Sequence, residues 1–126
     1  MIYTSYFAKI KYLPKNIIPI SICGKAPKWY NGLEYKKLAP KYDFFMQWKK
    51  NGDNKYYIDR FNEEVLGKLN AGEVIKELYK LSSQSNEDIA LICYEKPDDF
   101  CHRHLVSYWL NQNGIKCSEY KFEKAR

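Results

Sequence analysis

The residue types with the widest choice of chemistry in this chain gather in one short stretch, Cys93–His104. The stretch begins in an apolar run, Ile89–Tyr94, which is typical of a buried strand, and it leads into a helical pattern over Asp98–Asn113. Ligands of open α/β sheets bind beyond the carboxyl ends of the strands. The position of the stretch therefore predicts that it forms the functional site.

Three residues of this stretch, Glu95, His102 and Arg103, are the predicted catalytic residues. His102 and His104 are the two histidines of the protein, and histidine exchanges a proton near neutral pH more readily than other side chains. Glu95 or His102 is the predicted acid/base, while Arg103 and the N–H groups of the helix start suit a phosphate or carboxylate. The alternative is that Arg103 pairs with Glu95 or Asp99 at the surface.

Cys93, Cys101, Arg103 and His104 are also predicted to contact a ligand. With Asp98 or Asp99 as the helix cap, the thiol of Cys101 faces either the pocket or the core. In the pocket its pKa would be lowered and a thiolate nucleophile becomes possible, but a structural role is favoured because small buried thiols are common.

Cys93, Cys101, His102 and His104 could in principle bind zinc, because cysteine and histidine are its usual ligands. The spacing argues against a metal site. Adjacent residues on a helix point about 100° apart, so Cys101 and His102 are not expected to meet one ion. We therefore expect neither a metal nor a cofactor.

The composition indicates one globular domain over residues 1–126, with 45% hydrophobic and 17% aromatic residues. No apolar run is long enough for a membrane span, and the start of the chain does not resemble an export signal. We expect a cytoplasmic protein without membrane contact and with reduced cysteines. The net charge of +6 attracts polyanions, but the scattered lysines indicate a solvated surface rather than a nucleic-acid groove.

Alternating strand and helix patterns predict a small Rossmann-like three-layer α/β domain with a mainly parallel sheet. The predicted strands are Ile2–Ile10, Ile17–Cys23, Ile89–Tyr94 and Cys117–Phe122. The predicted helices are Tyr42–Lys50, Lys55–Asn70, Gly72–Leu81 and Asp98–Asn113. Within the second helix, Tyr57, Phe61, Val65 and Leu69 recur every four residues and are interpreted as core.

A long loop, predicted over Gly24–Pro40, follows the second strand. Long loops directly after a buried strand more often shape a site than merely connect elements. We therefore predict that residues beside or within this loop, together with an aromatic residue of the first strand, contact the ligand: Tyr3, Ser21, Cys23, Trp29 and Tyr30.

Two motifs carry a resemblance to a known family. Cys93-Tyr-Glu95 followed by Cys101-His102-Arg103 resembles the carboxy-terminal signature of the domain of unknown function 488 family. Leu38-Ala39-Pro40, Tyr57–Phe61 and Glu63-Glu64-Val-Leu resemble its middle region. The resemblance implies a small α/β fold and no established activity. Many relatives have Asp-x-Arg after the second strand, where this chain has Ser21-Ile-Cys23-Gly24.

These observations leave alternative functions open. The first is an enzyme that acts on a nucleotide or nucleic acid, with Tyr3, Trp29 or Tyr30 stacking on a base. The second is a non-catalytic module that binds a phosphorylated small molecule or a partner protein through the same pocket, which the missing Asp-x-Arg favours. A plain nucleic-acid binder is the third, and it predicts an affinity that falls steeply with salt. The sequence does not indicate the oligomeric state.

Overall fold

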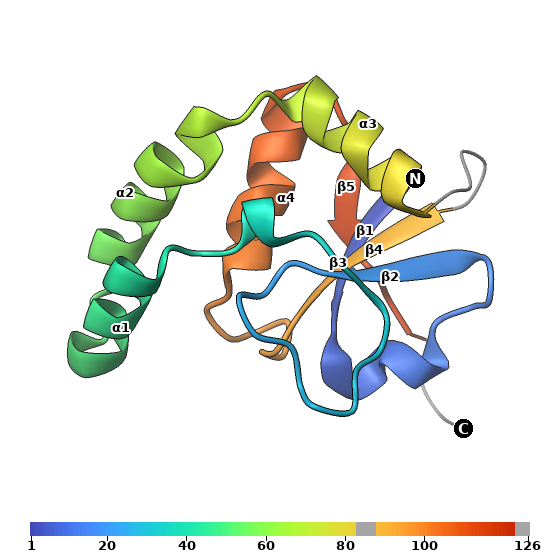
Figure 1. Cartoon of the computed structure of the whole chain (residues 1–126), viewed down its shortest axis with the longest axis horizontal. Helices are drawn as coiled ribbons and strands as arrows, with labels where there is room; N and C mark the ends of the chain where they lie inside the picture. The colour runs from blue at the N-terminus through green and yellow to red at the C-terminus, as the bar shows by residue number, and fades with distance from the viewer. Residues whose placement is uncertain (83–87, 123–126) are drawn as a thin grey trace.

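The computed structural model, which describes residues 1–82 and 88–122, is built on one parallel sheet (Figure 1). The strands lie in the order β3-β2-β4-β1-β5, and every neighbouring pair is parallel. This architecture confirms the predicted α/β class with a three-layer arrangement. The strands are β1 (Ile2–Tyr6), β2 (Ile17–Ser21), β3 (Leu33–Glu34), β4 (Asp88–Cys93) and β5 (Cys117–Glu119).

The side chains of the central strand β4 show that the sheet is covered on both faces. Successive side chains of a strand point to opposite faces, so Ile89 and Leu91 face one side while Ala90 and Ile92 face the other. All four are fully buried, and the two pairs belong to two separate apolar clusters. The nearly continuous apolar sequence of this strand reflects burial on both sides.

The four α-helices all contribute side chains to the larger of the two clusters. The predicted stripe on the second helix is confirmed as core, because Tyr57, Phe61 and Val65 are buried and Leu69 is partly buried. The other face carries a thinner layer, made by the 3-10 helix η1 (Phe7–Tyr12) and the loop after β2. The helices are α1 (Tyr42–Asn51), α2 (Asn54–Glu64), α3 (Ala71–Ser82) and α4 (His102–Gln112).

Several element boundaries differ from the prediction. The first strand ends at Tyr6, and the rest of its predicted length forms η1. The predicted loop Gly24–Pro40 contains β3, whose two residues are too few to leave a periodic pattern, and the 3-10 helix η2 (Lys36–Leu38). The second predicted helix ends at Glu64 and is followed by the 3-10 helix η3 (Leu66–Lys68).

The start of α4 is the correction with the largest consequence. The helix begins at His102 with Cys101 as N-cap, so neither Asp98 nor Asp99 caps it. Before the helix, the ring of Phe100 packs against Trp48, with ring centroids 5.4 Å apart, and against Tyr57 at 5.0 Å. Local sequence preference favours a helix start at Asp98 or Asp99. The backbone before His102 is irregular instead, and Phe100 in this segment makes tertiary contacts.

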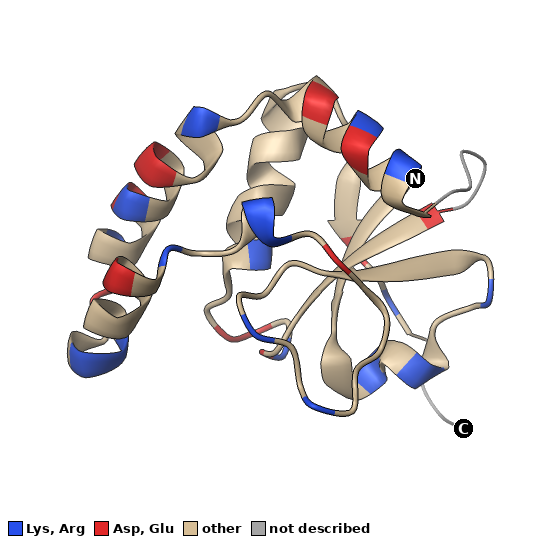
Figure 2. Ribbon diagram, in the orientation of Figure 1, with Lys and Arg blue, Asp and Glu red and all other residues tan. Residues whose placement is uncertain are grey.

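Basic residues occur on most elements of the chain and do not gather in one stripe in the view of Figure 2. No helix of the described residues is long and apolar enough to cross a membrane.

Candidate functional site

A cavity of about 760 Å³ opens at the carboxyl ends of β2 and β4, which are neighbouring strands. Its volume falls within the range of small-molecule sites, and its position is where open α/β sheets bind ligands. The hydroxyl of Tyr94, just after β4, donates to the main-chain oxygen of Lys25, just after β2, at 2.6 Å. This hydrogen bond joins the segments that follow the two strands, beside the cavity. Its lining residues are Cys23, Gly24, Lys25, Pro40, Tyr42, Phe45, Trp48, Lys49, Tyr57, Tyr94, Glu95, Phe100, Cys101 and His102.

Aromatic rings from α1, α2 and the segment before α4 form much of the cavity wall. Trp48 is central to them: its ring centroid lies 6.2 Å from that of Phe45, with stacked planes, and 5.4 Å from that of Tyr57. Phe100 contacts both Trp48 and Tyr57. Because these rings pack against one another, the cavity has apolar walls formed by ring faces and edges.

Glu95 is the one carboxylate among the described residues that line the cavity. Its side chain is half-buried and has no hydrogen-bond or ion-pair partner within residues 1–82 and 88–122. Carboxylates in such surroundings normally find a donor, so this group is available to a ligand.

Tyr57 adds a second polar group to the same wall. Its side chain is 2% exposed, and its hydroxyl has no hydrogen-bond partner in the described part of the chain. Burial raises the pKa of Tyr57, and the nearby charge of Glu95 raises it further. The hydroxyl therefore stays protonated at neutral pH and can donate a hydrogen bond into the cavity.

His102 lies at the floor of the cavity and is buried. Its Nε2 lies 2.7 Å from the main-chain oxygen of Ile22, and because a carbonyl only accepts, the proton is on Nε2. The other ring nitrogen, Nδ1, faces the sulfur of Cys101 at 4.0 Å. Burial lowers the pKa of His102 to about 4, with a further contribution from Arg103, so the ring is neutral at pH 7.

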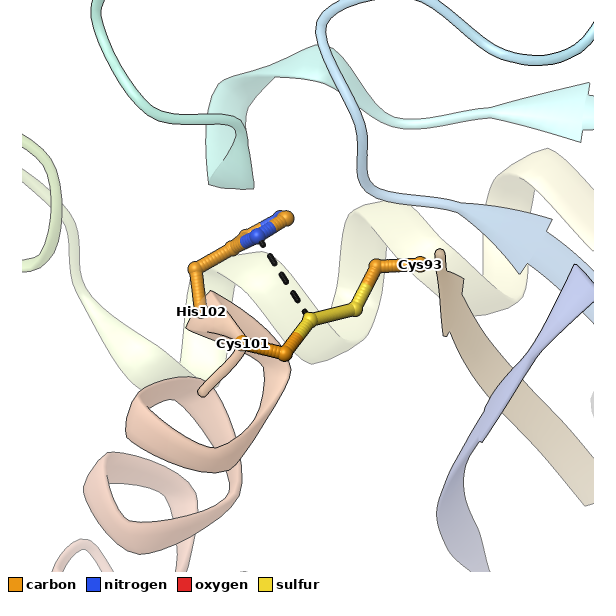
Figure 3. A group of neighbouring side chains, drawn as sticks. All are labelled: Cys93, Cys101 and His102. Atoms are coloured by element: carbon orange, nitrogen blue, oxygen red, sulfur yellow. Dashed lines mark hydrogen bonds between the residues drawn. A yellow bond between two sulfur atoms is a disulfide. The ribbon is translucent and has the colours of Figure 1, made fainter. Parts of the chain in front are cut away.

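Cys93 and Cys101 form a disulfide that links the end of β4 to the N-cap of α4 (Figure 3). The expectation of four reduced cysteines is therefore wrong for this pair, while Cys23 and Cys117 are free and buried. The pairing depends on the tertiary fold, since it joins a strand end to a helix start across an irregular segment. Single cysteines spaced along a sequence do not indicate such a pair.

The geometric argument against a shared ion at Cys101 and His102 is also wrong. Cys101 is the N-cap with an extended backbone, φ −154° and ψ 141°, so the 100° rule for adjacent helical residues does not apply to it. The donor atoms of Cys93, Cys101 and His102 all lie within 4.8 Å of one another.

Arg103 lies away from the cavity and is completely buried. Its Nε and Nη2 donate to the two carboxylate oxygens of Glu119, on β5, at 2.9 and 3.0 Å. Its Nη1 donates to the main-chain oxygen of Glu95 at 2.7 Å and to the sulfur of Cys93 at 3.1 Å. The alternative of a surface pairing with the carboxylate of Glu95 or Asp99 is therefore wrong, and the predicted contact of Arg103 with a ligand stays a prediction. Through these hydrogen bonds the guanidinium instead connects the segment after β4, the disulfide and β5.

Cys23 and Ser21 lie at the end of β2, close to the cavity floor. The thiol of Cys23 donates to the main-chain oxygen of Ile92 at 3.8 Å, and burial raises its pKa to about 12. The hydroxyl oxygen of Ser21 accepts from the backbone N–H of Cys23 at 3.3 Å. Cys23 therefore lines the cavity as a neutral thiol, and Ser21 positions it.

Three aromatic residues that were predicted to stack on a base lie elsewhere. Tyr3 and Tyr30 pack on the smaller apolar cluster, and Trp29 contacts Phe7 and Tyr30. None of the three lines the cavity.

His104 also lies outside the lining, and its Nε2 is buried without a partner in the described residues. Burial lowers the pKa of His104.

Sequence reasoning missed the aromatic wall, namely Phe45, Trp48, Tyr57 and Phe100, and the two lysines at the cavity, Lys25 and Lys49. Tyr57 was assigned to the core from its spacing, which is correct but incomplete, since one edge of its side chain also reaches the cavity. The available signal was composition: Trp48 and Phe100 are large aromatic residues beside polar, irregular segments.

The fold and cavity define a parallel-sheet α/β protein with a cavity at the carboxyl ends of two of its strands. The family comparison agrees with that class: the model DUF488-N3a, described as the active DUF488-N3 subclade, matches residues 6–114. The chain therefore belongs to the DUF488 family, as its two motifs indicated. No curated protein and no solved structure matches it.

Proposed function

We propose that this protein is an enzyme that binds a nucleotide in the cavity, with Glu95 as its general acid/base. The observation that carries the proposal is a carboxylate without a partner among the described residues, within an aromatic-walled cavity at the ends of two parallel strands. A half-buried group that receives no hydrogen bond from residues 1–82 or 88–122 is suited to exchanging a proton with a bound substrate. The family's description as an active subclade is in line with turnover.

The chemistry of the lining suits the parts of a nucleotide. The rings of Phe45, Trp48 and Phe100 offer faces on which a base stacks, which is favourable by about 1–3 kcal/mol per base. The Tyr57 hydroxyl supplies a donor for the polar edge of a base. Lys25 and Lys49, both exposed at the cavity, supply positive charge for a phosphate. In this proposal the lysines take the phosphate-binding role expected of Arg103.

Binding can be tested by titrating the protein with AMP, GMP, CMP and UMP and following tryptophan fluorescence, because Trp48 lines the cavity. We expect saturable binding that weakens several-fold in Lys49→Ala and that is unchanged in the matched control Lys50→Ala, whose side chain does not line the cavity. Equal effects of the two lysines, or no binding of any nucleotide, would contradict the proposal.

Catalysis is tested by Glu95→Gln, which keeps the shape of the side chain and removes its proton exchange. We expect the affinity for the nucleotide to persist while product formation, followed by chromatography, falls about 10²–10⁴-fold. The matched control is Asp98→Asn, a nearby exposed carboxyl that does not line the cavity.

A non-catalytic binding module remains the second candidate. It is favoured by the end of β2, where the buried Ser21 and the neutral thiol of Cys23 replace the charged pair of many relatives. This alternative predicts nucleotide binding by the wild-type protein without any product.

A further inference from the structure

We propose that Cys93 and Cys101 are a redox-active pair that exchanges with small thiols and disulfides entering through the cavity. This activity goes beyond the proposed nucleotide function and does not depend on it. The argument rests on the disulfide, on the different positions of its two cysteines relative to the cavity and on the polar group beside each sulfur. Figure 3 shows the disulfide with the ring of His102 beside Cys101.

The two cysteines differ in their position relative to the cavity. Both are buried, but Cys101 lines the cavity and is 4% exposed, whereas Cys93 is 0% exposed and does not line it. Thiol–disulfide exchange proceeds by attack of a thiolate on one sulfur of the disulfide, so the sulfur that is reached decides the direction. An incoming thiolate meets Cys101 first, and Cys93 is then the leaving group.

The surroundings of Cys93 suit a leaving thiolate. Nη1 of Arg103 donates to the sulfur of Cys93 at 3.1 Å, within a buried guanidinium that is itself held by Glu119. A hydrogen bond from a cation favours the thiolate over the thiol and speeds its departure. Arg103 is thus a positioning residue that stabilises the charge left on Cys93.

The surroundings of Cys101 suit the thiol form that opens onto the cavity. The unprotonated Nδ1 of His102 lies 4.0 Å from its sulfur, and this tautomer is set by the hydrogen bond of Nε2 to Ile22. A lone pair at this place can accept a hydrogen bond from the thiol of reduced Cys101, while the lowered pKa of His102 keeps the ring neutral. The pair therefore has one sulfur beside a hydrogen-bond acceptor and one beside a cation.

The reaction balances without any further oxidant. In the reducing direction, a small thiolate attacks the sulfur of Cys101, the Cys93–Cys101 bond breaks and Cys93 leaves as a thiolate. A second thiolate attacks the outer sulfur of the mixed disulfide, which releases the small disulfide and leaves Cys101 reduced. The small thiols lose the electron pair that the protein gains, and the reverse sequence reduces a small disulfide.

The free cysteines provide internal controls. Cys117 is buried outside the cavity, and burial raises the pKa of its thiol. Cys23 lines the cavity, but its thiol donates a hydrogen bond to a main-chain oxygen, and burial raises its pKa to about 12. Neither is expected to be a competent nucleophile at neutral pH.

The test uses the reduced full-length protein and 2-hydroxyethyl disulfide, followed by intact mass and peptide mapping. In Cys93→Ser, we expect Cys101 to be trapped as a mixed disulfide at least about tenfold faster than Cys117. In the wild-type protein, no adduct is expected to accumulate, because Cys93 resolves it and the Cys93–Cys101 disulfide forms. Cys117→Ser should behave as the wild type does.

Three outcomes would overturn the proposal: trapping of Cys101 no faster than Cys117, a wild-type protein that stays reduced, or tight zinc binding by the reduced protein that blocks exchange at both sulfurs. If Cys93→Ser fails to fold, equilibration of the wild-type protein in mixtures of 2-mercaptoethanol and its disulfide decides the question. Nucleotide titration of the same samples separates this result from the proposed function.

Discussion

His102 and Arg103 are neighbours in sequence, yet they belong to two regions with opposite character. His102 borders the open cavity, in which Glu95 and the hydroxyl of Tyr57 lack hydrogen-bond partners among the described residues. Arg103 lies in a closed network in which Glu119 accepts from the guanidinium and also from Thr4, whose hydroxyl is 2.7 Å away. Buried polar groups are normally satisfied, so the closed network is structural and the unsatisfied region is where a ligand is expected.

The largest effect should come from breaking the closed network. Arg103→Met leaves the carboxylate of Glu119 without its bidentate partner, and removing one member of a buried ion pair typically costs about 3–5 kcal/mol. Chemical denaturation should show this loss in the free energy of unfolding. The control is Lys55→Ala, which removes an exposed pair with Asp59 and should leave stability unchanged.

The double variant Arg103→Met/Glu119→Met sharpens the test, because it removes both charges and should recover part of the stability lost in the single variant. If the double variant were less stable than the wild type by the sum of the losses in Arg103→Met and Glu119→Met, the pair would not be coupled and the contrast between the two regions would be wrong.

The second prediction concerns His102, at the boundary between the regions. Its folded pKa of about 4 lies below its ordinary value of 6.5, so the unfolded chain binds the proton more readily. The stabilising contribution is complete above pH 6.5 and is lost as the pH falls toward 4, by about 3 kcal/mol over that interval.

The matching variant is His102→Gln, whose amide can still donate to Ile22 but does not titrate. Denaturation between pH 7 and pH 4 should show a shallower loss of stability in this variant than in the wild type. Identical pH dependence in the two proteins would mean that His102 is not held neutral by the fold.

The smallest effect belongs to the open region. Tyr57→Phe removes a hydroxyl that has no hydrogen-bond partner in the described part of the chain, so we expect little change in the free energy of unfolding and a loss of about 1 kcal/mol in nucleotide affinity. Fluorescence titration and denaturation measure the two quantities. Tyr108→Phe, which alters an exposed tyrosine outside this cavity, serves as the control. A large loss of stability in Tyr57→Phe would place its hydroxyl with the closed network instead.

Much of the fold could be read from patterns in the sequence. The apolar run of β4 is confirmed, and so is the core position of Tyr57, Phe61, Val65 and Leu69, although only the first two lie in α2. The motif containing Glu95 lies just after the carboxyl end of β4, as expected. Buried strands are predictable because the periodicity of burial is a local property, whereas the end of β1 at Tyr6 was not predicted. The aromatic wall was not predicted, since its rings come from three segments whose approach is a matter of tertiary packing.

The sequence by itself determined the class of fold and the family, because these follow from local periodicity and from motifs; that Cys93–His104 carries the chemistry stays a prediction. Only the tertiary structure decided which side of that segment each residue faces. Because α4 starts at His102 rather than Asp98, the helical spacing of about 100° per residue does not relate Cys101 to the residues that follow it. The position of β5 beside β1 brings Glu119 to Arg103. Partner choice for a buried charge depends on contacts between distant segments, and no local pattern encodes it.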